Sequence, residues 1–333
     1  MKYKYNMTQM ESLFDKLRSM EKDFLDKYSV DDIYSNSKIY EVLIANHFNH
    51  SLIPGHSGSR DAKDKDGNEI EYKHYKESSS NHSWTFNDFS TTSIAKISLC
   101  PYVYFVYIDD VKYTYPGQIS WAYIVSGKKI ARYLSTAVKT IKNKRKMINI
   151  SPTQLDKIDC SRILYKPFDI AKGVYGEDLN EIITTVQQLE NISGVTGLLT
   201  SNKLWELMVG IKLHHFVNSE QGGRKGAHDA IDEKGLKYEY KVSKSYSWQF
   251  QDISENVLEK YLQDHAIILA VVNKTYLKLD AIYTADPKIA VPVIREKLEE
   301  KKKRYSIKGK EIRRLQISLC KGDLIKIKAK KIL

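Results

Sequence analysis

The sequence has few cysteines and no long hydrophobic run. Its three cysteines, Cys100, Cys160 and Cys320, are far apart and show no metal-ligand pairing. This excludes a disulfide framework and fits a reducing compartment. The first residues contain no apolar run of signal-peptide length, and the longest apolar runs, such as Ala266 to Val272, are too short to cross a bilayer. We therefore expect a cytoplasmic protein with no membrane partner.

The composition fits a globular protein that meets a polyanion. A chain of 333 residues with 42% hydrophobic and 28% charged residues is long enough for two ordinary domains. Its 53 Lys and Arg residues exceed its 41 Asp and Glu residues, for a net charge of +12. Nucleic acid is the usual partner of so basic a protein. Charge alone does not decide this, because an AT-rich genome also encodes chains rich in lysine.

The sequence contains an internal repeat. The segment DAKDKDGNEIEYK at 61–73 aligns without a gap with DAIDEKGLKYEYK at 229–241. Matching segments flank it on both sides in the same order, namely KIYEVLI (38–44) with KLWELMV (203–209), and WTFNDFS (84–90) with WQFQDIS (248–254). Two unrelated stretches would not share this order of features, so we predict a tandem duplication. The predicted domains are residues 1–160 and 176–333, joined by a linker at 161–175.

Each copy predicts a small α/β domain with a mixed sheet flanked by helices. An amphipathic helix comes first, and Thr8 and Glu11 have the spacing of a capping box at its start. The remaining elements follow in one order, namely a helix (38–48 or 203–216), a hairpin turning at Asp66-Gly67 or Lys234-Gly235, a half-buried strand from Trp84 or Trp248, a helix, and a buried strand (102–108 or 266–272).

The hairpin of the first copy brings acidic residues and a lysine together. Glu71 and Lys73 are two residues apart on a strand, so their side chains project from one face. Pairing across the turn brings Asp61 beside them. Two converging carboxylates repel each other unless a cation lies between them. Oxygen ligands of this kind favour Mg²⁺, with Mn²⁺ as a substitute. Such an ion would polarise a phosphate oxygen and lower the pKa of a bound water.

The second copy repeats the pattern with Asp229, Glu239 and Lys241. A single Glu-x-Lys is common, and its competing interpretation is a solvated, salt-bridged surface. Here an Asp, a turn glycine and an upstream helical glutamate accompany the triplet twice, which favours a catalytic site. Asp64 and Asp232 also coincide between the copies and are alternative first metal ligands if the hairpin contains a bulge.

On these residues, each half resembles the PD-(D/E)XK, or restriction-endonuclease-like, nuclease superfamily. The resemblance implies that Asp61 and Asp229 bind metal and that Lys73 and Lys241 are the catalytic lysines. The remaining acids correspond to the second metal ligand, Glu71 and Glu239, and to the acid of the first helix, Glu41 and Glu206. It also implies two such domains related by a pseudo-twofold axis. The proline that names the motif is missing, since Arg60 and His228 precede the aspartates.

The resemblance implies a Mg²⁺-dependent endonuclease of the type II-like restriction kind, acting on double-stranded DNA. Two active sites in one monomer would each cut one strand of a palindromic or near-palindromic site. In a restriction system, a cognate methyltransferase would accompany the enzyme. Alternatives are a structure-selective repair nuclease or a homing nuclease of the same fold, or a non-catalytic DNA-binding module. The sequence does not exclude RNA as the substrate.

Several residues near the two triplets are candidate DNA contacts, with a plain polar loop as the competing interpretation. They are Lys76, Ser78 and Ser80 in the first copy, and Lys244, Ser245 and Ser247 in the second. The basic runs at 142–146 and 301–304 are expected to be helical faces near a nucleic-acid backbone or simply solvated.

Two further groups of residues are expected to be structural. The aromatic pairs Trp84 with Phe86 and Trp248 with Phe250 favour core packing over base stacking. His214 and His215 have no matching pair in the first copy, so they are expected on the helix surface.

Overall fold

The computed structural model describes residues 6–34, 38–54, 60–87, 90–113, 115–141, 147–158, 160–219, 228–309 and 315–333. The chain forms two compact units, and the division falls inside the long helices α1 (Met7–Tyr28) and α6 (Gly176–Ser193). The first unit contains Lys22–Ile33 and Ser37–Thr184, and the second contains Met1–Glu21, Tyr34–Asn36 and Thr185–Leu333. Each unit holds the sheet of one sequence copy, and each is described below by itself.

The first unit is built on a six-stranded sheet in the order β1-β2-β3-β5-β6-β8. Strands β3 and β5 are parallel, and the other neighbours are antiparallel, so the sheet is mixed. A separate two-stranded ladder joins β4 and β7. The elements are α2 (Lys38–Phe48), β1 (Ser51–Leu52), β2 (Ala62–Lys63), β3 (Glu69–Lys76), β4 (Trp84–Phe86), α3 (Thr91–Leu99), β5 (Tyr102–Asp109), β6 (Gln118–Ser126), α4 (Gly127–Thr140), β7 (Ile148–Ile150), α5 (Pro152–Asp156), β8 (Arg162–Leu164) and the 3₁₀ helix Ile170–Lys172.

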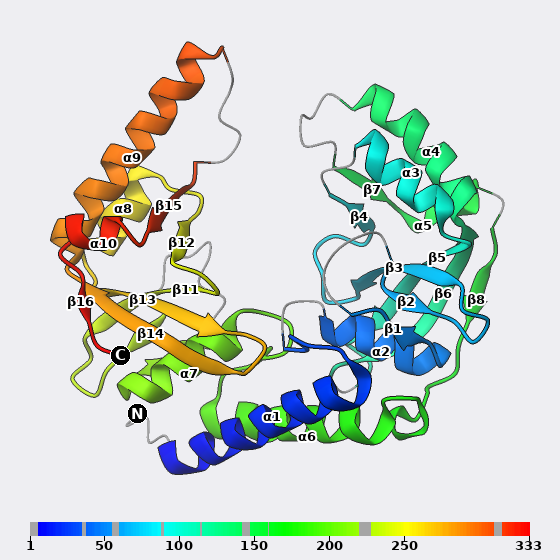
Figure 1. Cartoon of the computed structure of the whole chain (residues 1–333), viewed down its shortest axis with the longest axis horizontal. Coiled ribbons are helices and arrows are strands. Elements are labelled where there is room, and N and C mark those ends of the chain that lie inside the picture. The colour runs from blue at the N-terminus through cyan, green and yellow to red at the C-terminus, as the bar shows by residue number, and fades with distance from the viewer. Residues whose placement is uncertain are drawn as a thin grey trace. The chain divides into compact units, whose positions relative to one another are not determined.

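The second unit repeats this plan strand for strand. Its six-stranded sheet has the order β9-β10-β11-β13-β14-β16, again with one parallel pair, β11 and β13, and a separate ladder joins β12 and β15. The elements are α7 (Lys203–Leu213), β9 (Phe216–Val217), β10 (Ala230–Ile231), β11 (Lys237–Ser243), β12 (Ser247–Phe250), α8 (Glu255–Tyr261), β13 (Ala266–Asn273), β14 (Lys278–Ala285), α9 (Pro287–Ile307), β15 (Ile317–Cys320), α10 (Asp323–Lys326) and β16 (Lys330–Lys331). The predicted α/β class is confirmed, with two similar mixed sheets flanked by helices (Figure 1).

A hydrophobic core fills the space between each sheet and its helices. In the second unit, alternate residues of β13 pack with α8 and α9, and in the first, alternate residues of β5 pack with α3 and α4. Trp84 and Trp248 are fully buried in these cores. Their indole N–H groups donate to the carbonyls of Val106 (3.0 Å) and Ala270 (2.9 Å). The prediction of core packing is therefore confirmed, and these buried rings are not accessible for base stacking.

The hairpin turns differ from the prediction by one residue. Lys63 pairs with Glu69, and the Asp64 N–H donates to the Asn68 carbonyl, so three residues form the loop instead of two. Gly67 closes it with φ of 80°, a conformation that favours glycine because other residues would place a Cβ against the backbone. The second hairpin has the same register around Gly235. This register sets each aspartate of the motif opposite its glutamate.

Three boundaries also differ. Helix α1 begins at Met7, and the Asn6 side chain accepts from the Gln9 N–H (3.2 Å), so Asn6 takes the capping role predicted for Thr8. Helix α7 ends at Leu213, because His214 adopts a left-handed conformation. The segment predicted as a linker contains β8, which pairs with β6.

Among the described residues, no helix is long and apolar enough to cross a membrane. The predicted basic run at 142–146 lies outside the described residues.

Candidate active site

Strands β3 and β11 place an ion pair at the same position of each sheet. The ammonium group of Lys73 donates to a carboxylate oxygen of Glu71, and that of Lys241 donates to Glu239 in the same way. Each lysine also lies above the ring of a buried phenylalanine, at 5.4 Å from its centroid in both units. The ion pairs therefore face the side of the sheet that carries the core, as alternation along a strand requires.

The two aspartates occupy equivalent positions beside these pairs. Asp61 Oδ2 accepts a hydrogen bond from the Tyr72 N–H at 2.7 Å, and Asp229 Oδ2 accepts one from the Tyr240 N–H at 2.8 Å. In both motifs, the donor is the residue between the glutamate and the lysine. The hairpin register explains this, because it brings the aspartate opposite the glutamate. The geometry therefore places the Asp, Glu and Lys of each motif together.

Asp64 and Asp232, the alternative first ligands, are turn residues. Asp64 Oδ1 accepts from the N–H groups of Asp66 (2.9 Å) and Asn68 (2.8 Å), and the Asn68 amide also donates to Asp64 Oδ2 (3.0 Å). The Asn68 side chain and these N–H groups hold the pKa of Asp64 below its usual range. Asp232 binds its own loop in the same way. Both carboxylates stabilise the turn, so the geometry favours Asp61 and Asp229 as first ligands.

The helix acids Glu41 and Glu206 each pair with a buried lysine that the sequence analysis did not select. Lys38 Nζ lies 2.9 Å from Glu41 Oε2, and Lys203 Nζ lies 2.7 Å from Glu206 Oε2. The lysine side chains are only 5% and 8% exposed. The available signal was that both lysines coincide between the copies, three residues before the glutamate, which is a contact spacing on a helix.

The carboxylates of each site share one electrostatic environment. Burial, with Asp61 and Glu41 nearby, raises the pKa of Glu71 to about 7 although Lys73 opposes the shift. Burial and Asp229 likewise raise the pKa of Glu239 to about 7, against the effect of Lys241. Burial and the motif aspartates also raise the pKa values of the helix acids in both units. The two glutamates of each site therefore hold their protons more tightly than exposed glutamates do.

The second site opens onto a cavity of about 800 Å³. Its walls include the motif residues Glu206, Asp229, Glu239 and Lys241. Candidate DNA contacts Lys244, Ser245 and Ser247 line it, so they lie where a substrate of the second site would be held.

The candidate contacts of the first unit lie differently. Lys76 follows Lys73 by three residues on β3, so it projects from the opposite face of the strand. Its Nζ lies 3.6 Å from Asp110 Oδ2, and the Ser78 N–H and hydroxyl also donate to Asp110 (2.9 and 2.5 Å). Ser80 is exposed. Lys76 and Ser78 thus serve a local polar cluster, and their predicted DNA contact stays a prediction.

A histidine supports the back of each site, which corrects the prediction for His215. The His215 side chain is buried, and its Nδ1 lies 2.8 Å from the Tyr240 hydroxyl. His50 makes the same contact with the Tyr72 hydroxyl at 2.7 Å. The prediction of a surface position was wrong because α7 ends at Leu213 and the chain then turns inward. His50 is the matching residue of the first unit, and each pair anchors the tyrosine whose N–H holds the aspartate.

The two sites are not identical. Two residues before the buried strand, the first unit has Cys100 and the second has Asp264. Burial and Asp229 raise the pKa of Asp264 to about 6. Arg60 precedes Asp61, where His228 precedes Asp229, and Arg60 forms an ion pair with Glu69. The second site therefore has one more carboxylate than the first.

Among the described residues, no group of three or more His, Cys, Asp and Glu side chains is arranged to hold a metal ion. The candidate donors are thus the Asp–Glu pair beside each lysine. No family model matches the chain, and no curated protein matches it.

Proposed function

We propose that the protein is a Mg²⁺-dependent endonuclease of double-stranded DNA, with one active site in each unit. One observation carries the proposal: the same Asp, Glu and Lys, with the same hydrogen bonds, are built twice on equivalent strands. A salt-bridged surface would not require burial of these charges, which is costly. The order of the motif residues and of the strands supports the resemblance to the PD-(D/E)XK superfamily.

The donor set of the first site fits a hard divalent cation. Glu71 Oε2 is buried and has no hydrogen-bond partner among the described residues, which is costly for a carboxylate oxygen. Asp61 and Glu71 would hold Mg²⁺ in the first unit, and Asp229 and Glu239 would hold it in the second. Few protein ligands, all oxygen, suit Mg²⁺. When bound, the ion supplies polarisation of a phosphate oxygen and a more acidic water.

The lysines provide the remaining charge for phosphodiester hydrolysis. Burial lowers the pKa of Lys73, but Glu71 and Asp61 more than offset it, so the net effect is a raised pKa and the ammonium stays charged. The same holds for Lys241. A permanently charged ammonium beside the carboxylates orients the attacking water and stabilises negative charge that develops on the phosphoryl group.

Two sites in one chain suit the two strands of a duplex. Antiparallel strands are related by local twofold axes, so each unit would cut one strand and a monomer would produce a double-strand break. This favours a restriction-type enzyme with a palindromic or near-palindromic target, paired with a methyltransferase that protects the host DNA.

A supercoiled-plasmid assay tests the proposal. With Mg²⁺, the wild type should linearise the plasmid, Lys73→Ala and Lys241→Ala should each produce only nicked circles, and the double variant should be inactive. Lys128→Ala, on helix α4, is the matched control and should cut both strands. Linear product from either single catalytic variant would contradict the assignment of one strand to each site. Cleavage only at branches or ends would favour a repair nuclease, and tight binding without cleavage would favour a non-catalytic module.

A further inference from the structure

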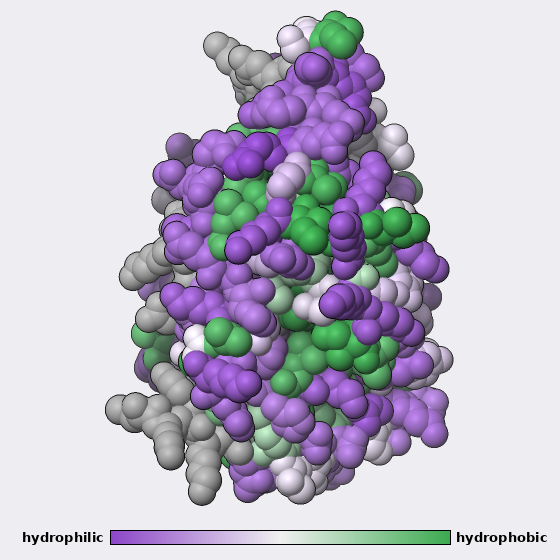
Figure 2. Space-filling model, turned by 90° about the vertical axis from the view of Figure 1, so that its left-hand side faces the viewer, coloured by the Kyte–Doolittle hydropathy of each residue, from purple (hydrophilic) through white to green (hydrophobic). Residues whose placement is uncertain are grey.

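A second cavity of the second unit, of about 260 Å³, lies between helix α9 and the strands β12 and β15. Three basic side chains of α9 line it, namely Lys297, Lys301 and Arg304. They follow one another at intervals of four and three residues, so they share one face of the helix. Figure 2 shows that hydrophilic residues cover most of the top of this side of the molecule, where α9 lies. We call this cavity the α9 groove.

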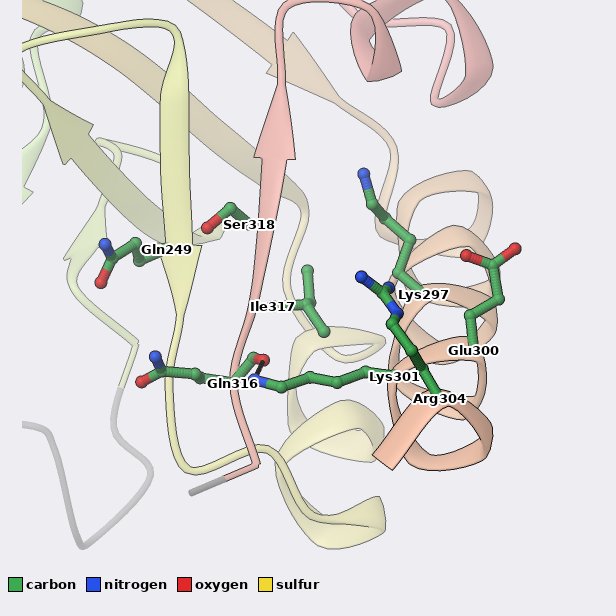
Figure 3. A pocket seen from close by; sticks show the side chains of 8 residues that line it. All are labelled: Gln249, Lys297, Glu300, Lys301, Arg304, Gln316, Ile317 and Ser318. Carbon is green, nitrogen blue, oxygen red and sulfur yellow. Dashed lines mark hydrogen bonds between the residues drawn. The ribbon is translucent and has the colours of Figure 1, made fainter. Parts of the chain in front are cut away.

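The described part of the chain does not neutralise all the charges of the α9 groove. Lys297 forms an ion pair with Asp323, and Lys301 Nζ donates to the Gln316 carbonyl at 2.5 Å. Arg304 has no hydrogen-bond or ion-pair partner among the described residues. In Figure 3 the side chains of Lys301 and Arg304 extend from α9 toward β15, while the Glu300 carboxylate points away from the strand. Among the residues that the structure describes, the groove therefore presents a guanidinium group that no other side chain neutralises.

The opposite wall carries neutral hydrogen-bonding groups and reaches the active site. Gln249 of β12 and Ser318 of β15 line the α9 groove (Figure 3). Gln249 also lines the cavity that contains Glu239 and Lys241, so the groove and the second active site share a wall. A ligand that is long, anionic along its length and cut at the active site would run from one cavity into the other.

The first unit differs from the second at several of the groove positions. Counted from the first residue of each helix, Ala137 and Ile141 stand where α9 has its two lysines. On the strands, Thr85 and Asn149 replace the glutamine and the serine, and they bond to each other at 2.9 Å. Counted in the same way, Lys144, which lies outside the described residues, corresponds to Arg304, so the two copies differ at the two lysine positions of the helix and at the glutamine and serine positions of the strands.

We propose that the α9 groove binds the phosphodiester backbone of duplex DNA next to the strand segment held in the second active site. This inference rests on the proposed nuclease function and adds where the substrate lies. Arg304 would contact one phosphate with its guanidinium, which suits two-point contact with phosphate oxygens. Lys297 and Lys301 would add to the positive potential, and Gln249 would guide the backbone toward Lys241.

The test is the salt dependence of DNA binding, measured without metal so that no cleavage occurs. A fluorescent 30-bp duplex is titrated with the wild type, Arg304→Gln and Lys288→Gln in EDTA at several salt concentrations. Lys288 is the matched control, because it is an exposed cation of α9 that lies outside both the groove and the basic run at 301–304. Losing one phosphate contact should weaken binding and reduce the slope of log affinity against log salt by about 1 for Arg304→Gln.

Lys288→Gln should keep the wild-type slope, and all three proteins should have the same melting temperature. Equal slopes for Arg304→Gln and Lys288→Gln would overturn the groove assignment, whether both match the wild type or both fall. The outcome is separable from that of the proposed function. If the protein cleaves DNA with Mg²⁺ but Arg304→Gln keeps the wild-type salt slope, only the groove assignment fails. If Arg304→Gln reduces the salt slope but the protein does not cleave DNA, only the proposed nuclease function fails.

Discussion

The buried glutamates of the two sites should make the metal-free protein less stable as the pH rises. Glu71 and Glu239 have pKa values of about 7 in the folded chain, against 4.5 for an ordinary glutamate. A raised pKa means that the folded chain holds its proton more tightly than the unfolded chain does. The resulting stabilisation is complete below pH 4.5 and disappears as the pH rises through 7. Between pH 5.5 and 8, the glutamate of each site loses about 2 kcal/mol of this stabilisation of the folded state.

Urea denaturation in EDTA at these two pH values measures the effect. Buried histidines such as His215, whose pKa burial lowers to about 4, change stability in the opposite sense over this range. The informative quantity is therefore the difference in the free energy of unfolding between the wild type and the variant Glu71→Gln/Glu239→Gln. This difference should be smaller at pH 8 than at pH 5.5 by about 4 kcal/mol, summed over the two sites. The variant Glu233→Gln/Glu296→Gln, which changes two exposed glutamates, is the control, and its free energy of unfolding should have the pH dependence of the wild type.

Mg²⁺ should restore stability to the wild type at pH 8 and have little effect on Glu71→Gln/Glu239→Gln, because a ligand that binds only the native state stabilises it. Parallel pH dependence of these two proteins in EDTA would refute the reasoning about burial. A wild type that gains nothing from Mg²⁺ at pH 8 would instead refute the metal assignment.

Two further predictions concern residues around the sites. Trp248→Ala should lower the free energy of unfolding by about 3–5 kcal/mol in thermal or urea denaturation, because it empties a core position, and should leave the DNA affinity of the folded protein unchanged. An unchanged free energy of unfolding would contradict the core role of this ring. Lys203→Met should lower the free energy of unfolding by about 3 kcal/mol and move the pH profile of cleavage to higher pH, because Glu206 loses the cation that favours its ionised form. Lys212→Met, which changes an exposed lysine of the same helix, should alter neither quantity. An unshifted pH profile for Lys203→Met would show that Glu206 does not act in the site.

The architecture was largely accessible from the sequence because the duplication doubled every weak signal. A glutamate two residues before a lysine is uninformative alone, but its recurrence with an aspartate, a turn glycine and a buried strand predicted the hairpin and the faces of its side chains. The pairing register of the hairpin strands was then predictable to within one residue. The turn was misjudged because Asp64 accepts bonds from two N–H groups of its loop, which stabilises a three-residue loop in place of the two-residue turn that Asp-Gly suggests.

The features that the sequence did not reveal depend on burial and on where a helix ends. Lys38 and Lys203 coincide between the copies, yet lysine is so commonly exposed that only their depth in the fold identifies them as partners of the helix acids. His215 looked like a continuation of α7, and only the left-handed His214 turns it toward Tyr240. Contacts of this kind join residues far apart in the chain, so periodicity carries no signal for them.

The differences between the sites predict that the two strands are not cut under the same conditions. Asp264 gives the second site a carboxylate where the first has Cys100. One more negative charge near a bound dication is worth about 1 kcal/mol at the screening of bulk water, or roughly fivefold in the metal concentration required. Lys73→Ala, which leaves only the second site, should therefore nick at lower Mg²⁺ than Lys241→Ala, and adding Asp264→Cys to Lys73→Ala should remove the advantage. Equal Mg²⁺ dependence of the two single variants would show that Asp264 does not reach the metal, and the divergence between the copies would then concern substrate contacts alone.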